Sequence, residues 1–381
     1  MSTRPLDSSD VTSLLGRTVR ARLTPADRRA FQGRRVLVTG AGGSIGSEMA
    51  RTISSCRPKL IGLLDHSEYH LVQIEREVRA MWPDVDVVAC LADITREAQV
   101  QKAFRRADPD VVYHAAACKH VTIAEREVAV AAEVNVVGTA IVAQAAADAG
   151  ARFVLISSDK AAAPESVMGA TKRLAELVTL SRASRTFRPV VVRFGNVLGS
   201  SGSVVEIMRA CIHAGRPIPI TDPDATRYFM TAGEAVALVV RADRIATAPE
   251  TFWLDMGEPV RVGDLAARVI ALEQAAGHAS PGIHIIGLGP GEKRHEQLAD
   301  PHLVFRRAAD RRMWCADQQP VDRVEIDRML LQLRRAVRLA DDAAALRVLT
   351  SAVSGFMPSA AARQGATWVA TSGNPRDGRA A

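Results

Sequence analysis

Residues 158–172 contain several side chains that can move protons. Ser158, Asp159 and Lys160 are consecutive, and Lys172 follows in a segment with helical spacing. A Tyr four residues before a Lys on one helix is a common proton-transfer pair in enzymes, but Met168 stands at that position here. Met168 has no proton to give. Any acid–base chemistry must therefore come from the three consecutive residues upstream.

The same residues also allow a plainer interpretation. Asp159 and Lys160 could form an ordinary ion pair in a turn, and a Met in a helix is more often a core residue than part of a site. Two features favour the functional interpretation. The cluster follows an apolar segment, RFVLISS (152–158), and parallel strands place binding residues at their carboxyl ends. Met168 is also in register with Lys172.

The elements that must position this cluster alternate regularly along the chain. Short apolar runs typical of buried parallel strands occur at 34–40, 59–65, 85–93, 109–117, 152–158 and 188–199, with a further strand near 252–257. Segments with helical spacing lie between them, at 44–53, 67–81, 99–107, 130–150 and 165–184. The alternation predicts an α/β fold with a doubly wound parallel sheet, the Rossmann arrangement.

The segment VTGAGGSIGSE (38–48) joins the first predicted strand to the first predicted helix. Gly40 permits a tight turn, Gly43 lets the backbone approach a pyrophosphate, and Gly46 lets the helix pack closely on the strand. Ser44 and Ile45 open the helix, whose free N–H groups and positive dipole end would face the phosphates. The segment therefore predicts dinucleotide binding.

Acidic and apolar residues at the ends of the next strands complete the predicted cofactor site. Asp65 ends the second strand, where a carboxylate accepts ribose hydroxyls and repels a 2′-phosphate, so the predicted cofactor is NAD rather than NADP. Asp93 could meet the adenine, or it could simply cap the turn after the third strand. Ile94 and Ala115, after the third strand and in the fourth, are assigned to the same site.

The alternation stops after Gly199, which predicts a second and smaller unit. Pro-rich turns, short strands and helices at 233–247 and 263–276 follow. We expect the following division: an N-terminal arm packed outside the core at 1–30, a Rossmann NAD-binding domain at 31–199, an interleaved substrate-binding domain at 200–300, a helical extension at 301–357 and a disordered tail at 358–381.

The composition is that of a soluble globular protein. The 381 residues are 48% hydrophobic, and the net charge of +7 is spread without a basic block, which disfavours a nucleic-acid surface and suits an anionic substrate. Five scattered cysteines form no CxxC pair, so we expect neither a disulfide framework nor a metal site. The start lacks a signal-peptide core, and no apolar stretch is long enough for a membrane span. We expect a cytoplasmic protein.

Together the motifs resemble a known family. TGAGGSIG (39–46), YHAAACKHV (113–121), NVVGT (135–139), ISSDK (156–160) and MGATK (168–172) follow the order of the extended short-chain dehydrogenase/reductase superfamily. Within it, the chain resembles the polysaccharide-biosynthesis nucleotide-sugar 4,6-dehydratases, typified by UDP-N-acetylglucosamine 4,6-dehydratase, over about residues 14–357. Many members carry an N-terminal membrane region. This chain starts at the equivalent of the linker, so a soluble form is expected, and a homo-oligomer is implied.

The resemblance implies a redox-neutral loss of water from a nucleotide sugar. Hydride would leave C4 for NAD⁺, C5 would lose a proton, C6 would lose its hydroxyl, and hydride would return to C6. Ser158 would hold the 4-hydroxyl, Asp159 would protonate the C6 hydroxyl and Lys160 would deprotonate C5. Lys160 would then need a lowered pKa, which burial and the nicotinamide charge could supply. Lys172 would bind the nicotinamide ribose, and Met168 would mark members that retain configuration at C5.

The resemblance also assigns residues around this centre. Asn135 would support Lys172 through backbone and water. Residues that would contact the nucleotide sugar are Lys119, His120, Glu125, Asn196, Arg227 and Lys293. Gly289 stands where the family commonly has the Arg of an Arg-Pro-Gly-Glu-Lys motif, so the identity of the nucleotide and the sugar stays open.

Two other functions remain open on the sequence. An NAD-dependent nucleotide-sugar epimerase, or a variant such as a 5,6-dehydratase, would share the first oxidation step. Asp159 and Lys160 favour elimination, because a simple 4-epimerase needs no such pair. A catalytically silent dinucleotide-binding regulator is the other alternative, and the intact Ser-Asp-Lys sequence disfavours it.

Overall fold

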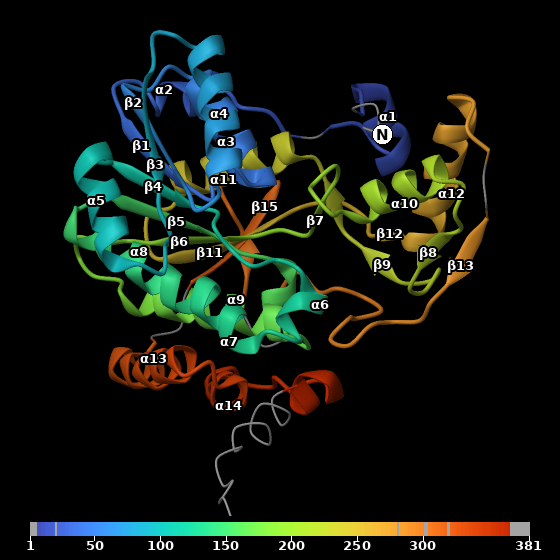
Figure 1. Cartoon of the computed structure of the whole chain (residues 1–381). Coiled ribbons are helices and arrows are strands. Elements are labelled where there is room, and N and C mark those ends of the chain that lie inside the picture. Colours follow the sequence, from blue (N-terminus) through green and yellow to red (C-terminus); the bar gives the residue numbers. More distant parts are fainter. Residues whose placement is uncertain (1–5, 20, 280–281, 301–303, 318–320, 366–381) are drawn as a thin grey trace, which may run out of the picture.

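A nine-stranded sheet forms the centre of the computed structural model, which describes residues 6–19, 21–279, 282–300, 304–317 and 321–365 (Figure 1). The strand order is β14-β15-β11-β6-β5-β4-β1-β2-β3. The parallel strands are β1 (Arg35–Thr39), β2 (Leu60–Asp65), β3 (Asp86–Leu91), β4 (Val111–His114), β5 (Arg152–Ile156), β6 (Val190–Arg193) and β11 (Glu250–Leu254). This confirms the predicted doubly wound fold.

Helices cover both faces of the sheet, because its strands are apolar on both sides. In β1, Leu37 packs into one core cluster, whereas Val36 and Val38 pack into another. The second cluster contains the helices α3 (Ser44–Ser54), α4 (Glu68–Met81) and α11 (Ala232–Ile245). The first contains α5 (Glu97–Ala107), α8 (Thr139–Asp148), α9 (Val167–Ser181), α13 (Arg323–Arg338) and α14 (Asp342–Ala352).

The long helix expected at 130–150 is interrupted. It consists of α7 (Val128–Ala132), a π-helical turn (Glu133–Gly138) and then α8. By length and composition the stretch Val128–Asp148 could cross a membrane, but 78% of its apolar window is buried inside the protein. It is therefore packed as the central helix of a folded core. A π-turn inside a helix is frequent at functional sites, and this one contains Asn135.

The smaller unit lies beside the carboxyl ends of the central strands (Figure 1). Its helices are α10 (Val204–His213) and α12 (Val262–Ala275), and they share an apolar cluster. Its short strand pairs are β7 (Asn196–Val197) with β10 (Phe229–Met230), β8 (Ile218–Ile220) with β13 (Ile283–Ile285), and β9 (Thr226–Arg227) with β12 (Val260–Arg261).

The N-terminal segment packs into both units rather than outside the core. In α1 (Ser8–Leu15), Leu14 is fully buried, and its carbonyl accepts a hydrogen bond from Arg268 of α12. In α2 (Pro25–Arg29), the buried carboxylate of Asp27 pairs with Arg241 and Arg244 of α11. The hydrogen bond from Arg241 lowers the pKa of Asp27. These polar contacts join residues that are far apart in the sequence, so the spacing of apolar residues could not predict them.

The C-terminal part also departs from the expectation of an all-helical extension. Two antiparallel strands, β14 (Arg306–Arg307) and β15 (Met313–Asp317), extend the sheet beside β11 before α13 and α14 begin. The strands are short and their flanks are rich in Arg, so their residue pattern did not predict strands. Residues 360–365 are helical, so the predicted disorder is wrong for the start of the tail, and residues 366–381 lie outside the described residues.

Candidate active site

The turn between β1 and α3 has the shape of a phosphate cradle. Gly40 has a φ of +65°, and a Cβ there would lie 2.7 Å from the Ala116 backbone. A Cβ on Gly46 would lie 1.9 Å from the Gly40 carbonyl oxygen, so only glycine permits this approach. Gly43 is the N-cap of α3, and no side chain caps the helix there. The free N–H groups at this end are therefore available to an anion.

The two residues that open α3 have local roles. The Ser44 hydroxyl accepts a hydrogen bond from the Ser201 backbone N–H at 3.0 Å, which ties the cradle to the loop after β7. Ile45 is half-buried against the cluster under α3. Neither contact blocks the cradle itself.

Asp65 is the last residue of β2 and lies next to the glycine turn. Its Oδ2 accepts from the Gly42 N–H at 2.8 Å and its Oδ1 from the Ser67 N–H at 2.9 Å. A carboxylate oxygen can accept a second hydrogen bond, so both atoms keep capacity for ribose hydroxyls. Asp65 thus joins the glycine turn to the end of β2.

The residues after β3 and β4 are used mainly for structure. Oδ1 of Asp93 accepts two hydrogen bonds from Thr95 at 2.8 Å, which is the turn cap given above as the alternative to adenine contact. Ile94 is buried where a Cβ on Gly138 would collide with it. Ala115 continues the backbone pairing by donating to the Thr39 carbonyl.

Ser158, Asp159 and Lys160 form a connected group at the end of β5. Asp159 and Lys160 begin a short 3₁₀ turn (Asp159–Ala161). The Ser158 hydroxyl donates to Asp159 Oδ1 at 2.9 Å, and Lys160 Nζ donates to the same oxygen at 3.0 Å. Lys160 Nζ also lies 3.2 Å from the Asn196 side-chain oxygen. The structure therefore brings three predicted catalytic residues together with one predicted substrate residue.

Glu296 is a member of this group that sequence analysis did not find. Its Oε1 lies 3.4 Å from Lys160 Nζ, so the amine lies between two carboxylates. The side chains of Asp159 and Glu296 are 0% and 3% exposed. Within the described residues, Asp159 Oδ2 and Glu296 Oε2 are buried without a hydrogen-bond partner. Buried polar atoms normally have partners, so these two oxygens mark where a ligand or a proton belongs.

The charge on Lys160 differs from the expectation. Burial alone would lower its pKa, but the neighbouring Asp159 and Glu296 outweigh burial and raise the pKa. The charge of Arg227 opposes them weakly. The predicted lowering is thus wrong for this structure. The physical reason is the charge of Asp159 first and then that of Glu296, which reaches Lys160 from a loop more than a hundred residues away.

Lys172 and Met168 lie one turn apart in α9, as predicted. Lys172 Nζ donates to the Ile156 carbonyl at 2.6 Å, and burial lowers its pKa to about 8 against the opposing charge of Glu176. Met168 is 4% exposed and packs in the core cluster of that face. Met168 therefore supplies volume, and the amine of Lys172 is held at the end of β5.

Asn135 does not contact Lys172. Its side-chain oxygen accepts from the Cys118 N–H at 2.8 Å, and its side-chain nitrogen donates to the Cys118 carbonyl and the Thr171 hydroxyl at 2.9 Å. Asn135 thereby ties the loop after β4 to α9. Through Thr171 it supports the helix that carries Lys172.

Two predicted substrate residues have other partners. Glu125 is 2% exposed, and its oxygens accept from the Val167 N–H at 2.7 Å and the Ser359 hydroxyl at 2.6 Å. Lys293 is buried and donates to the backbone carbonyls of Ala162 and Ala163. Glu125 fixes the start of α9 and Lys293 fixes the loop after Lys160, and contact of either residue with the sugar stays a prediction.

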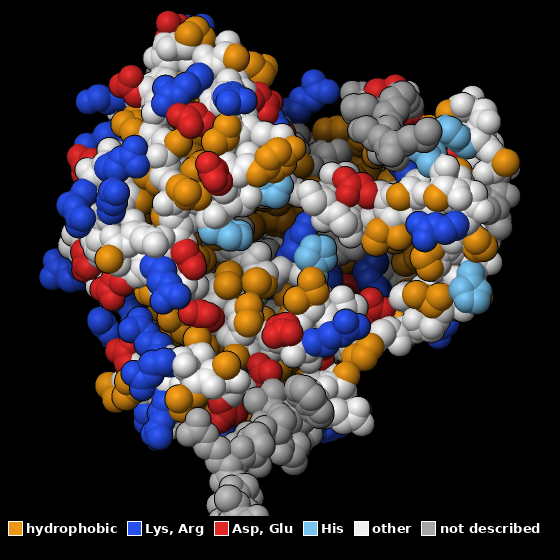
Figure 2. All heavy atoms as spheres, viewed as in Figure 1, with side chains coloured by type: hydrophobic (Ala, Val, Ile, Leu, Met, Phe, Trp, Pro, Cys, Tyr) orange, Lys and Arg blue, Asp and Glu red, His pale blue; other side chains and the backbone are white. Residues whose placement is uncertain are grey.

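Of the remaining predicted substrate residues, Lys119 and His120 contact the loop after β7, and Arg227 contacts the loop that carries Glu296. Lys119 Nζ donates to the Ser201 carbonyl at 2.7 Å, and the ring of His120 lies where a Cβ on Gly202 would touch it. Arg227 donates to the Arg294 carbonyl at 3.0 Å and acts electrostatically on Lys160. Figure 2 shows a hollow on this face between the Rossmann domain and the smaller unit, with histidine and basic side chains around it.

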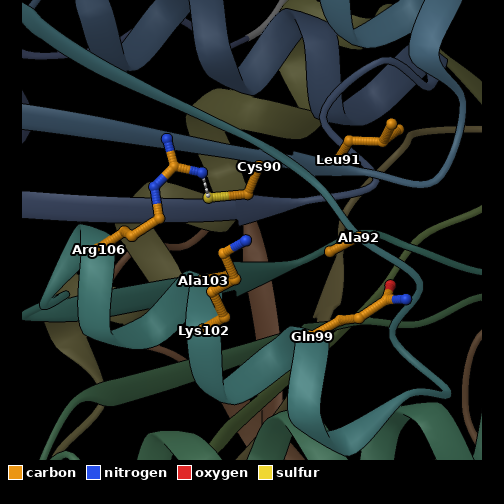
Figure 3. Close-up of a pocket in the computed structure, with 7 residues that line it drawn as sticks. All are labelled: Cys90, Leu91, Ala92, Gln99, Lys102, Ala103 and Arg106. Atoms are coloured by element: carbon orange, nitrogen blue, oxygen red, sulfur yellow. Dashed lines mark hydrogen bonds between the residues drawn. The ribbon is translucent and has the colours of Figure 1, made fainter.

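A separate cavity of about 210 Å³ lies at the edge of the sheet, between β3 and α5. Figure 3 shows Arg106 directed toward the thiol of Cys90, with Lys102 and Gln99 on the same helix. Burial raises the pKa of the Cys90 thiol. None of the residues grouped around Lys160 lines this cavity, so it is distinct from the candidate site.

A family model described as "Polysaccharide biosynthesis protein" matches residues 36–315. The chain belongs to this family. It is 45% identical over 295 residues to a probable polysaccharide biosynthesis protein, EpsC, of Bacillus subtilis, covering 76% of this chain and 49% of that protein. It is 38% identical over 326 residues to the capsular polysaccharide biosynthesis protein CapD of Staphylococcus aureus, covering 84% of this chain and 54% of that protein. The chain thus spans about half the length of these relatives.

Other comparisons bear on the fold and the predicted family. A UDP-N-acetylglucosamine 4,6-dehydratase (inverting) of Campylobacter jejuni is 28% identical over 285 residues, covering 72% of this chain and 81% of that protein. The crystal structure of Pen from Bacillus thuringiensis matches with a TM-score of 0.69 and 30% identity, covering 77% and 92% of the two chains. The family and fold predicted from the sequence are confirmed.

Proposed function

We propose that this chain is the catalytic unit of an NAD-dependent nucleotide-sugar 4,6-dehydratase that acts on UDP-N-acetylglucosamine. The observation that carries the proposal is the group formed by Ser158, Asp159 and Lys160 at the carboxyl end of β5, beside Lys172. In this group a hydroxyl and an amine both lie within hydrogen-bond distance of the same carboxylate oxygen. Oxidation at C4 and elimination across C5 and C6 require these three kinds of side chain.

The residues present fit NAD. The glycine turn leaves no room for a side chain at Gly40 or Gly46, the start of α3 has no side-chain cap, and Asp65 retains acceptor capacity for a ribose. When bound, NAD⁺ would supply the hydride acceptor for C4 and, once reduced, the hydride donor for C6. Lys172, with a pKa of about 8, would donate hydrogen bonds to the ribose hydroxyls. The carboxylate of Asp65 would disfavour the 2′-phosphate of NADP.

The proton chemistry is assigned to the residues after β5. Ser158 would orient the 4-hydroxyl, and Asp159 would take its proton as C4 is oxidised. The ketone acidifies the C5 proton, which Lys160 would remove. Asp159 would then return its proton to the departing C6 hydroxyl, so one carboxyl group serves both steps. Its buried and unpaired Oδ2 supports this assignment, because a substrate hydroxyl would give it a partner.

Met168 supports retention of configuration at C5. A Tyr at this position could deliver a proton to the sugar, whereas a buried thioether cannot. With Lys160 as the remaining base near C5, the proton would return from the side from which it left. Arg227 and Asn196 from the smaller unit, and Lys119 and His120 from the loop after β4, would contact the nucleotide diphosphate and sugar. The positive charge of Arg suits a diphosphate.

The test is incubation of the purified protein with NAD⁺ and UDP-N-acetylglucosamine, followed by mass spectrometry of the nucleotide sugar. We expect a product lighter by one water molecule. Lys160→Ala should abolish this product, and Lys102→Ala, an exposed lysine on α5, should not. A product of unchanged mass would favour an epimerase. No product with any UDP- or dTDP-hexose would refute the proposal.

A further inference from the structure

The base proposed for C5 carries a proton in the resting site. Lys160 Nζ lies 3.0 Å from Asp159 Oδ1 and 3.4 Å from Glu296 Oε1, and both carboxylates raise its pKa. An ammonium group cannot remove a proton from carbon. The site must therefore contain an acceptor for the Lys160 proton before C5 can be deprotonated.

Glu296 is held firmly at this position. Its loop crosses the residues after Lys160 and is fixed on both sides of Glu296. On one side, Lys293 donates to the Ala162 carbonyl at 3.0 Å. On the other, Asp300 accepts from the Ala163 N–H and from Arg193, each at 3.0 Å. The carboxylate is thereby presented to Lys160 by a rigid support.

We propose that Glu296 is a positioning residue that takes the ammonium proton of Lys160 during turnover and so lets Lys160 act as the base at C5. This inference rests on the proposed dehydratase function. Two observations carry it: the Oε1 of Glu296 lies next to the amine, and its Oε2 is buried with no partner among the described residues. A carboxylate with one oxygen at the amine and the other unsatisfied is suited to accept a proton.

The proton transfers balance over one turnover. Asp159 first takes the proton of the 4-hydroxyl, which removes one of the two negative charges beside Lys160. The Lys160 proton then moves to Glu296, leaving a neutral amine and a carboxylic acid. The amine removes the C5 proton, the electron pair of that bond forms the C5–C6 double bond, and the C6 hydroxyl leaves as water with the proton of Asp159. Lys160 finally returns a proton to C5, and Glu296 returns its proton to Lys160.

The charged groups around Lys160 support proton transfer to Glu296 after Asp159 has been protonated. Asp159, Lys160 and Glu296 together carry one net negative charge when all are ionised, and Arg227 is the further cation that acts on Lys160. Tyr228 lies near Asp159, and burial raises its pKa, so it stays neutral. Loss of the charge on Asp159 leaves a buried Lys160–Glu296 ion pair. In a site from which substrate excludes water, a neutral pair becomes competitive with an ion pair.

The experiment compares Glu296→Gln with Glu292→Gln, a glutamate in the same loop that accepts from the Gly289 N–H. With NAD⁺ and UDP-N-acetylglucosamine, we expect Glu296→Gln to form reduced nicotinamide at the wild-type rate. The reduced nicotinamide should then persist, and release of water should fall about 100-fold at neutral pH. Uptake of deuterium at C5 from D₂O should fall in parallel, with KM nearly unchanged.

The pH profile separates this role from a purely structural one. Without Glu296, Lys160 must lose its proton to solvent, so the activity of Glu296→Gln should recover as pH rises, whereas the wild type should not need alkaline pH. NMR titration of labelled lysines should show a lower pKa for Lys160 in the variant. Glu296→Asp, which keeps a carboxylate, should retain part of the activity, and Glu292→Gln should behave as the wild type.

Three results would overturn the inference. The first is water release by Glu296→Gln at the wild-type rate at neutral pH. The second is equal loss of C4 oxidation and of elimination in a folded Glu296→Gln protein, and the third is a lost activity that alkaline pH does not restore. If the wild-type protein releases no water from any nucleotide sugar, the proposed function fails first, and that result is seen before any variant is made.

Discussion

Gly46 and Gly43 lie in the same turn, but a methyl group should affect them differently. At Gly46 a Cβ would lie 1.9 Å from the Gly40 oxygen and 2.7 Å from its carbonyl carbon, and neither is part of a side chain that could move away. At Gly43 the nearest atom would be 3.3 Å away. Gly43 also has a φ of −73°, which any residue adopts. The first substitution therefore disturbs packing, whereas the second makes one tight contact, with the Gly40 oxygen, that a shift of a few tenths of an ångström relieves.

The magnitudes follow from these distances. Overpacking costs about 1–3 kcal/mol, and a clash with backbone lies at the upper end of that range. Alanine regains up to about 1 kcal/mol of helix propensity over glycine. Gly46→Ala should thus lower the free energy of unfolding by about 2 kcal/mol. Gly43→Ala should change it by less than about 0.5 kcal/mol. It should nevertheless weaken NAD binding about tenfold or more, because its methyl group occupies the approach to the pyrophosphate.

Urea denaturation followed by tryptophan fluorescence gives the stability of both variants, and calorimetric titration with NAD⁺ gives the affinity. The combination is informative because the predicted effects separate. Wild-type NAD affinity in Gly43→Ala would refute the assignment of the turn as the pyrophosphate cradle. Wild-type stability in Gly46→Ala would refute the packing argument.

Three further outcomes are expected. Burial lowers the pKa of His114 to about 3, so below pH 6.5 the unfolded chain binds a proton at this residue and the folded protein does not. The free energy of unfolding should therefore fall by about 1.4 kcal/mol for each pH unit below 6.5. Urea titrations of His114→Asn should lack this slope. Lys293→Met leaves two carbonyls without their donor and should lower stability by about 1–3 kcal/mol, measured by denaturation, and should slow turnover as well. Met168→Leu should keep both activity and C5 configuration, assayed by NMR of the product, because Met168 supplies volume only.

Local patterns in the sequence predicted the sheet and its cofactor turn well. The strands from β1 to β6 were recognised as short apolar runs, and those from β1 to β5 are each followed by a segment with helical spacing, so alternation alone predicted the parallel sheet. The glycine turn could be assigned because its requirement for small residues is local. β14 and β15 were missed, since β15 pairs with the distant strand β11, and β14 joins the sheet only through β15.

The part of the candidate site that lies on one segment of the chain was predicted. The part that a second, distant segment contributes was missed. Ser158, Asp159 and Lys160 are adjacent in sequence at the end of a predicted strand, so their proximity could be predicted. Glu296 reaches Lys160 from a loop, and no spacing rule connects the two positions. Asp159 first and Glu296 second raise the pKa of Lys160 against its burial, which explains why the pKa was predicted in the wrong direction.

Glu125 and Lys293 illustrate a second limit. Both are charged residues in loops near the site, a pattern typical of substrate contacts. In the structure their hydrogen bonds go to backbone groups and to Ser359. Sequence alone cannot distinguish a charged side chain that binds a ligand from one that satisfies buried backbone.

The central claim is that hydride removed from C4 returns to C6 of the same sugar while one water is lost. The direct measurement uses UDP-N-acetylglucosamine carrying deuterium at C4, with NMR and mass spectrometry of the product. The account predicts a product lighter by one water with the deuterium at C6 and with unchanged configuration at C5. A product that keeps its oxygen atoms, or one that loses water without deuterium at C6, would contradict it.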